Sequence, residues 1–371
     1  MRLGLTQLGN VRVAIRAMAG KLGVDLVETP PTTHRTLSLG VKYSPETVCL
    51  PFKIQLGNMI EALELGADTL VMPGGPGPCR FGYYHNIHER VLRELGYQFH
   101  MVNQDRGVMH IIKYLTNGAP IRKVIAGLRF GIAKLKAVDN LERIVHEMRA
   151  RARDKGEATR TYREGLEAID SAADYRSLSR AKREYQQKLM SLPRSASSAP
   201  LAVGLTGEIF IVLDPFANMD IETELGKLGV WVRRGVFVSD FVTFDPRGGL
   251  VWVHERNKAH RAAMPYVTRH LGGDGWQSVG EKVLHDRDWD GIVHVEPLGC
   301  MPEITARNIM PSTKERLPVL DLIYDEHTGK AGIMSRLEAF VDMLQRKKRK
   351  QSPAQKPATA THRLAMTSLP K

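Results

Sequence analysis

Three cysteines are the residues of this 371-residue chain best suited to reactive or metal-binding chemistry. Cys49 and Cys300 each precede a proline that can occupy the first turn of a helix. Cys79 ends the loop MetProGlyGlyProGlyProCys (72–79), and Cys300 lies in GluProLeuGlyCysMetPro (296–302). A helix N-terminus lowers the pKa of a thiol, so these positions are expected to favour thiolates.

Thiolates are soft ligands, which suit zinc or iron–sulfur clusters. Three cysteines would leave one iron of a four-iron cluster without a protein thiolate. Zinc would need a fourth ligand, and His85 or His294 could supply it. Cysteine is also among the most often buried residue types. The spacing alone therefore leaves three alternatives open: inert core cysteines, a cluster, and zinc or a nucleophile. An odd number of cysteines argues against a disulfide framework.

The elements that must position these cysteines follow an alternating pattern. Over residues 1–125 and again over 201–345, short β-rich runs alternate with helical stretches, which predicts parallel sheets covered by helices. The two halves contain similar short motifs, since LeuGlyLeuThr (3–6) in the first resembles ValGlyLeuThr (203–206) in the second. We expect an α/β protein with two doubly wound Rossmann-like domains. Ligands bind beyond the carboxyl ends of such strands, so the three thiols are expected to converge between the domains.

Two segments lie outside this pattern. Residues 126–200 are dense in charge and have apolar residues at helical spacing, which predicts a helical arm and linker. The tail, 346–371, is basic and poor in apolar residues, so we expect it to be disordered. Of the net charge of +13, the tail contributes eight and residues 142–194 of the arm contribute four. The two domains are therefore nearly neutral, and nucleic acid is not an expected partner.

The composition limits the cellular setting. The chain is 43% hydrophobic, and no apolar run approaches the roughly 20 residues of a membrane-spanning helix. The first residues lack the apolar core and the cleavage site of a signal peptide. A cytoplasmic location without membrane association is therefore expected.

Six motifs stand out over the two α/β domains. They are GluThrValCysLeuProPheLys (46–53), the strand and ProGlyGly loop before Cys79, GlyLeuThrGlyGluIlePhe (204–210), AspProPheAlaAsnMetAspIleGlu (214–222), GluProLeuGlyCysMetPro (296–302) and the segment 325–342. Together they resemble a known family, the acyl-CoA dehydratase activase-related proteins, which are relatives of the 2-hydroxyacyl-CoA dehydratase subunits. The resemblance covers both α/β domains in order and weakens over the arm and the tail.

The resemblance implies a [4Fe–4S] cluster between two Rossmann-like domains, with Cys49, Cys79 and Cys300 as ligands and one iron site left open. It also implies a separate ATP-hydrolysing activator that delivers low-potential electrons, for electron transfer or for radical reduction or dehydration. The chain would then be a dehydratase-like or reductase component, and no catalytic residue is assigned. A related cluster-binding subunit or a homodimer is a further expected partner. The chain has no GxxxxGK[ST] phosphate loop of its own.

Other residues are candidates for supporting the cluster. Glu46 and Lys53 flank Cys49, and Lys53 could offset the negative charge of a thiolate-bound cluster. Glu208 could point into the same cleft or cap the next helix. Weaker candidates are Asn218 and Arg307.

Two alternatives complete the predictions. His85 and His88, which follow Cys79 closely, are interpreted as surface residues. The alternative function is a non-catalytic scaffold or interaction subunit, whose cysteines are inert or bind zinc.

Overall fold

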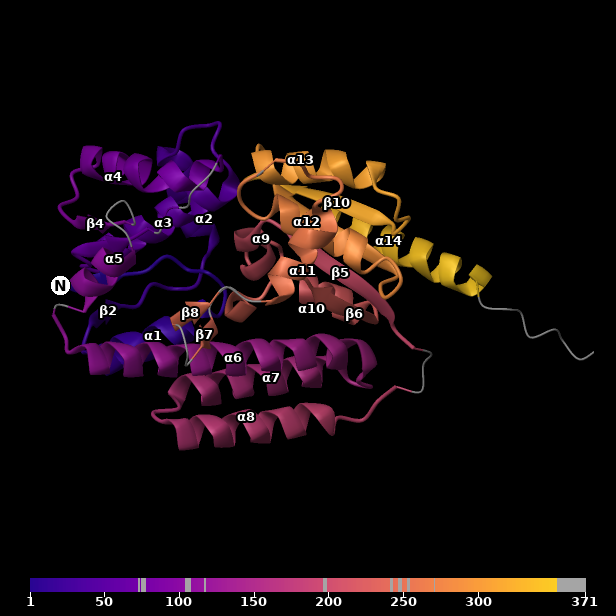
Figure 1. Ribbon diagram of the computed structural model, residues 1–371, viewed down its shortest axis with the longest axis horizontal. Helices are drawn as coiled ribbons and strands as arrows, with labels where there is room; N and C mark the ends of the chain where they lie inside the picture. The colour runs from indigo at the N-terminus through magenta and orange to yellow at the C-terminus, as the bar shows by residue number, and fades with distance from the viewer. Residues whose placement is uncertain are drawn as a thin grey trace, which may run out of the picture.

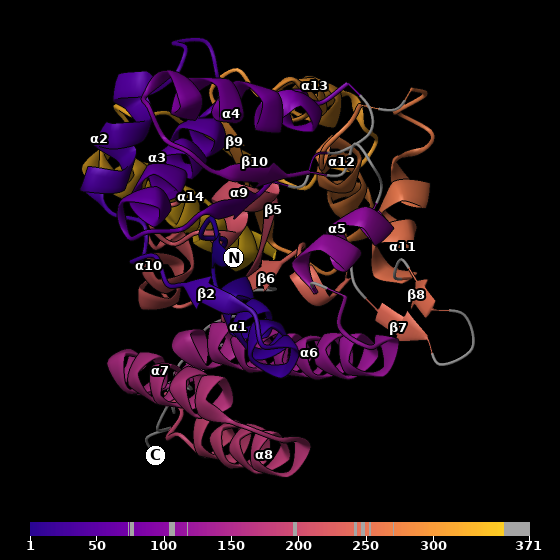
Figure 2. The same ribbon diagram turned by 90° about the vertical axis from the view of Figure 1, so that its left-hand side faces the viewer.

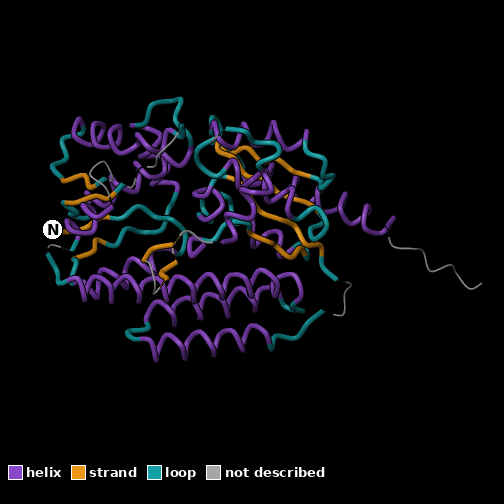
Figure 3. The backbone as a smooth tube through the Cα atoms, in the orientation of Figure 1, coloured by secondary structure: helices purple, strands orange, loops and turns teal. Residues whose placement is uncertain are grey.

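The computed structural model places two α/β domains side by side along a three-helix arm (Figure 1). It describes residues 1–72, 74, 78–103, 108–116, 118–195, 199–240, 243–245, 249–251, 254–269 and 271–351. The strands of the two sheets lie in separate halves of the molecule (Figure 3). The arm runs along one side of both halves, and a quarter turn shows it in the same place (Figure 2).

The first domain is built on four parallel strands in the order β2-β1-β3-β4. Helix α1 lies on the face toward the arm, and α3 and α4 lie on the opposite face (Figures 1 and 2). The strands are β1 (Arg2–Gly4), β2 (Asp25–Val27), β3 (Thr69–Val71) and β4 (His100–Val102). The helices are α1 (Val11–Leu22), α2 (His34–Tyr43), α3 (Leu50–Glu64), the 3₁₀ helix η1 (Arg80–Tyr83), α4 (Tyr84–Glu94) and α5 (Val108–Leu115).

The second domain repeats the same topology. Its parallel strands have the order β10-β9-β5-β6, so counting along the chain gives 2-1-3-4 in both sheets. This confirms the α/β class with two Rossmann-like parallel sheets. The strands are β5 (Leu201–Gly207), β6 (Val230–Arg234), β9 (Gly291–Pro297) and β10 (Val319–Tyr324), with a separate hairpin of β7 (Thr243–Asp245) and β8 (Gly249–Val251).

Helices cover both faces of the second sheet. Apolar residues of α9, α10 and α14 share one core with the strands, and α11, α12 and α13 form another. The helices are α9 (Ile209–Leu213), α10 (Ile221–Lys227), η2 (Val238–Asp240), α11 (His254–Ala263), α12 (Gly275–Leu284), α13 (Met301–Ile309), η3 (Met310–Ser312) and α14 (Lys330–Gln351).

The arm consists of α6 (Ile121–Arg151), α7 (Lys155–Ser171) and α8 (Tyr175–Met190). Asp154 and Asp174 cap the second and third of these helices through their carboxylates, which marks where each begins. Helix α6 packs against α1 of the first domain and against α10 and β6 of the second. The arm is therefore joined to both domains.

The structure differs from the sequence-based expectations in a few elements. Helices α2 and α12 were not expected, because their glycines weaken the helical pattern. Those glycines lie where another backbone passes, since a Cβ on Gly40 would overlap the carbonyl of Lys53 and one on Gly280 that of Ala259. The first helix of the arm begins at Ile121, before residue 126. Helix α14 continues to Gln351, beyond the expected start of disorder, and residues 352–371 lie outside the described residues.

Helix α3 is buried on every side, from Leu50 to Leu63. Most of its apolar side chains lie in the core of the first domain, but Leu50 and Ile54 belong to the core of the second. Helix α2 packs closely along it, because Gly57 brings the backbone of α3 against the carbonyl of Thr36. The helix that begins next to Cys49 is thus held by both domains.

We expect Gly57→Ala to lower the free energy of unfolding by about 1–3 kcal/mol, because the added methyl forces α2 and α3 apart. Gly20→Ala is the matched control: a Cβ at Gly20 meets nothing, so alanine is expected to stabilise helix α1 by about 0.5–1 kcal/mol. Urea unfolding of both variants measures the difference. Equal effects of the two substitutions would contradict the close packing of α2 on α3.

Candidate functional site

Each cysteine is the residue that precedes a helix. Cys49 is the N-cap of α3, Cys79 that of η1 and Cys300 that of α13. Cys79 follows β3 and Cys300 follows β9, and each of these is the third strand of its four-stranded sheet along the chain. The repeated topology therefore delivers these two thiols from equivalent positions. At the position of Cys49, the second domain has Asp274, the N-cap of α12.

Arg80 ties the three cysteine segments together across the domain boundary. Its guanidinium donates to the carbonyl of Thr47 at 3.0 Å, just before Cys49. It also donates to the carbonyl of Gly299 at 2.7 Å, just before Cys300. Because Arg80 directly follows Cys79, one side chain links all three segments. Sequence reasoning missed this residue, whose only local signal is its place beside Cys79.

The second domain also packs directly on the Cys79 segment. A Cβ added to Gly272 would lie 2.8 Å from the backbone nitrogen of Cys79, and one on Gly273 would lie 4.0 Å from its sulfur. The Gly273 position also lies against Pro302, close to Cys300. We define the cysteine site as Cys49, Cys79 and Cys300, and the two glycines leave space beside it that a larger residue would fill.

The pKa values run against the expectation that helix N-termini favour thiolates. Burial raises the pKa of Cys49 to about 11 and that of Cys300 still further, and it also raises the pKa of Cys79. The first-turn N–H groups act in the opposite direction, but the loss of solvation is larger. Cys49 and Cys300 are each 7% exposed. As free thiols, these side chains are protonated at neutral pH.

Two residues of α4 cover the first turn of α3. The hydroxyl of Tyr84 lies 2.6 Å from the sulfur of Cys49, and its ring meets Phe52 edge-on. His88 stacks on the same phenylalanine and hydrogen-bonds to its carbonyl at 3.1 Å. Burial lowers the pKa of His88 to about 4, so the ring is neutral. The interpretation of His85 and His88 as surface residues is wrong, because both are buried in this packing.

Glu208 lies close enough to all three thiols for its charge to change their pKa values. Its carboxylate accepts from the backbone N–H of Ile211 at 2.9 Å and caps α9. In its ionised form, its negative charge raises the pKa of each cysteine. Burial raises the pKa of Glu208 itself to about 8, so the carboxyl is mostly protonated at neutral pH. Glu208 therefore combines capping with a position beside the thiols.

The other predicted supporting residues take different positions. Lys53 is buried and pairs with Glu326 of the second domain at 2.5 Å. The charge of Lys53 is therefore compensated by a carboxylate of the second domain. Glu46 is exposed. Asn218 donates to the carbonyls of two residues of α9, and Arg307 pairs with a glutamate of β9 at 2.9 Å. The last two therefore have structural partners.

His294 is committed to two carboxylates. Its ring lies 2.8 Å from Asp321 and 2.9 Å from Glu303, one at each nitrogen. Although burial acts to lower it, these hydrogen bonds raise the pKa of His294 to about 9. The ring is therefore charged at neutral pH and has no free nitrogen for zinc.

The comparisons with known proteins give no assignment. No protein-family model matches the chain, and no curated protein matches its sequence. Within the described ranges, no three His, Cys, Asp or Glu side chains are grouped so as to hold a metal ion. The same part of the chain contains no helix that is long and apolar enough to cross a membrane. Residues 73 and 75–77, in the loop before Cys79, lie outside the described residues.

We expect Glu208→Gln to reduce the loss of stability that accompanies rising pH. The folded chain holds the proton of Glu208 with a pKa of about 8, against 4.5 for an ordinary glutamate, so the free energy of unfolding falls as the pH rises between these values. Glutamine has no proton to lose and keeps an oxygen for Ile211. Urea unfolding at both ends of this pH range measures the change. Glu46→Gln, at an exposed position, is the control. If the stability of Glu208→Gln fell with rising pH as much as that of the wild type, Glu208 would not be the group that holds this proton.

Proposed function

We propose that the chain is an iron–sulfur protein with a [4Fe–4S] cluster bound between its domains by Cys49, Cys79 and Cys300. The observation that carries the proposal is the linkage of all three cysteine segments by Arg80, which spans both domains. A structural core cysteine needs no such linkage. The motif resemblance to the acyl-CoA dehydratase activase-related proteins supports the same proposal and remains part of it.

The surroundings suit a negatively charged group of this kind. Arg80 acts to lower the pKa of Cys49 and Cys79, and so favours their thiolate forms. Gly272 and Gly273 leave space beside Cys79 that any side chain would occupy. Because the free thiols are protonated, metal binding has to release their protons, and cluster assembly is expected to be pH-dependent.

When bound, the cluster would supply single electrons at low potential and one iron without a protein thiolate. The chain's own residues would shield it and control protons. Phe52 and Tyr84 cover the Cys49 side and exclude water. Glu208 holds a proton beside the thiols at neutral pH. The ion pair of Lys53 with Glu326 joins the two domains about one helical turn from Cys49.

This chemistry fits one component of a larger system. We propose that a separate ATP-hydrolysing activator supplies the electrons, and that the chain uses them in electron transfer or in radical reduction or dehydration. A related cluster-binding subunit or a second copy of the chain is a further proposed partner. A cytoplasmic location, where cysteines stay reduced, is part of the same proposal.

The alternative is a non-catalytic scaffold with inert thiols. The observation that favours it is the raised pKa of the thiols, together with the hydrogen bond between Cys49 and Tyr84, since a buried structural cysteine has the same properties. A scaffold would be colourless after anaerobic purification, and all three thiols would react with an alkylating reagent once the chain is unfolded.

We expect anaerobically purified protein to contain about four iron and four acid-labile sulfide per chain. Serine at Cys49, Cys79 or Cys300 is expected to remove most of both, because serine replaces a thiolate with a hard, protonated ligand. Thr305→Ser, at a half-buried position of α13, is the control and is expected to keep wild-type contents. Iron and sulfide analysis, with circular dichroism to verify folding, makes the measurement. Wild-type protein without iron would rule the proposal out.

A further inference from the structure

The sulfur of Cys49 has a hydrogen-bond partner that the other two cysteines lack. The hydroxyl of Tyr84 lies 2.6 Å from this sulfur. Within the described ranges, no side chain forms a hydrogen bond with the sulfur of Cys79 or Cys300. Tyr84 is therefore the one described side chain that is hydrogen-bonded to a proposed cluster ligand.

Aromatic side chains hold the ring of Tyr84 in this position. Tyr84 begins α4 and is 3% exposed, and its ring meets that of Phe52 edge-on, with 4.8 Å between the ring centroids. Phe81 and His88 meet the same ring edge-on at 6.0 and 5.9 Å. Because Phe52 lies in the first turn of α3 and Phe81 in η1, the ring is held against the helices that two of the cysteines precede.

The chemistry of the two groups determines the direction of this hydrogen bond when Cys49 is a ligand. A thiolate has no proton, so its sulfur can only accept, and the phenol of Tyr84 is then the donor. Hydrogen bonds to the sulfur atoms are among the factors that set the reduction potential of an iron–sulfur cluster. A donor stabilises negative charge on the sulfur, and this stabilisation is larger in the more negative, reduced state.

We propose that Tyr84 donates its hydroxyl to the thiolate of Cys49 and thereby raises the reduction potential of the cluster. The inference rests on the proposed function, since it requires Cys49 to be a cluster ligand. Reduction adds one electron, which the proposed activator supplies or, in a titration, dithionite, and the phenol keeps its proton in both states. Tyr84 is thus a positioning residue, because it acts through Cys49 and contacts no substrate.

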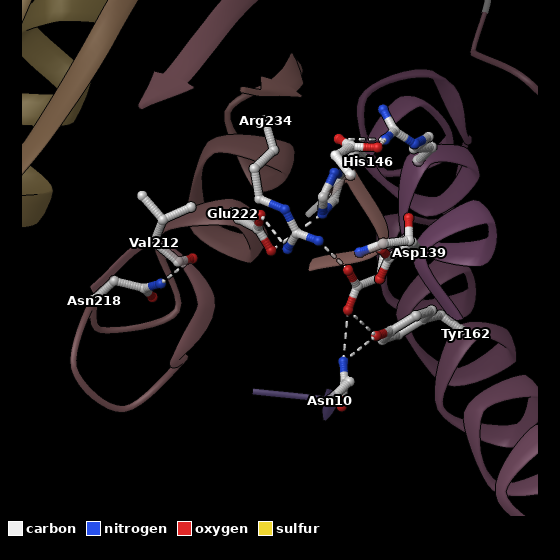
Figure 4. A network of polar contacts seen from close by, with 12 residues as sticks. Asn10, Asp139, His146, Tyr162, Val212, Asn218, Glu222 and Arg234 are labelled. Carbon is white, nitrogen blue, oxygen red and sulfur yellow. Dashed lines mark hydrogen bonds and ion pairs between the residues drawn. The ribbon is translucent and has the colours of Figure 1, made fainter. Parts of the chain in front are cut away.

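A buried polar network at the arm holds the domains together independently of Tyr84 (Figure 4). Arg234 of β6 pairs with Glu142 of α6 and, at 3.1 Å, with Glu222 of α10. Glu142 also accepts from the side chain of Asn10, in the first domain, at 2.6 Å. Both domains and the arm are therefore expected to keep their arrangement when the hydroxyl of Tyr84 is removed, so that a changed potential reports on the hydrogen bond.

Redox titration of the full chain, purified anaerobically and followed by electron paramagnetic resonance, tests the proposal. Tyr84→Phe removes the hydroxyl and keeps the ring against Phe52. We expect this variant to have the iron content of the wild type and a more negative midpoint potential. The equilibrium constant for reduction is expected to fall at least about threefold, which is about 30 mV at 59 mV per tenfold change for one electron.

Tyr83→Phe is the matched control, because the adjacent tyrosine is 63% exposed and its hydroxyl has no hydrogen bond with another described residue. We expect it to keep the wild-type potential. An unchanged potential in iron-loaded Tyr84→Phe would overturn the inference and leave the cluster proposal standing. Loss of iron from Tyr84→Phe alone would also overturn it, because the hydroxyl would then be needed to hold the cluster. Wild-type protein without iron would overturn the cluster proposal and this inference together.

Discussion

Helix α3 is the element on which the arrangement of the cysteine site depends. Its residues from Leu50 to Leu63 are all buried, since the first domain covers most of its surface and the second domain takes up Leu50 and Ile54 in its own core. The helix is therefore a shared part of two hydrophobic cores, and separating the domains would expose it. Cys49 begins this helix, so its position relative to Cys300 is fixed by apolar packing as well as by Arg80.

The same burial determines the chemistry of the thiols. A helix N-terminus alone would favour thiolates, but loss of solvation raises the pKa of all three cysteines. The site therefore stores protons on its thiols and on Glu208 until a positively charged group displaces them. The iron ions of a bound cluster would supply that positive charge, whereas an inert core would keep its protons. The two functional alternatives thus differ in whether the thiols release their protons to bind a cluster or keep them.

The sequence predicts the fold well where its pattern is repeated. Alternating strands and helices, with the echo of residues 3–6 in 203–206, indicate two related parallel sheets, and both have the 2-1-3-4 order. Helices α2 and α12 are not predicted, because their glycines weaken the helical pattern in the sequence. In the structure these glycines allow the backbone of another helix to pass close by. The contacts of Arg80 and Tyr84 with the cysteine segments join residues far apart in the chain, so no local pattern reveals them.

An anaerobic crystal structure with anomalous diffraction data collected at the iron edge tests the central claim most directly. The account predicts one compact iron peak between the two domains, within bonding distance of the sulfur atoms of Cys49, Cys79 and Cys300. It also predicts that Arg80 keeps its contacts with Thr47 and Gly299 around that peak. Well-ordered thiols packed against Tyr84 and Glu208 with no iron between them would contradict it, and the scaffold would then be the better description.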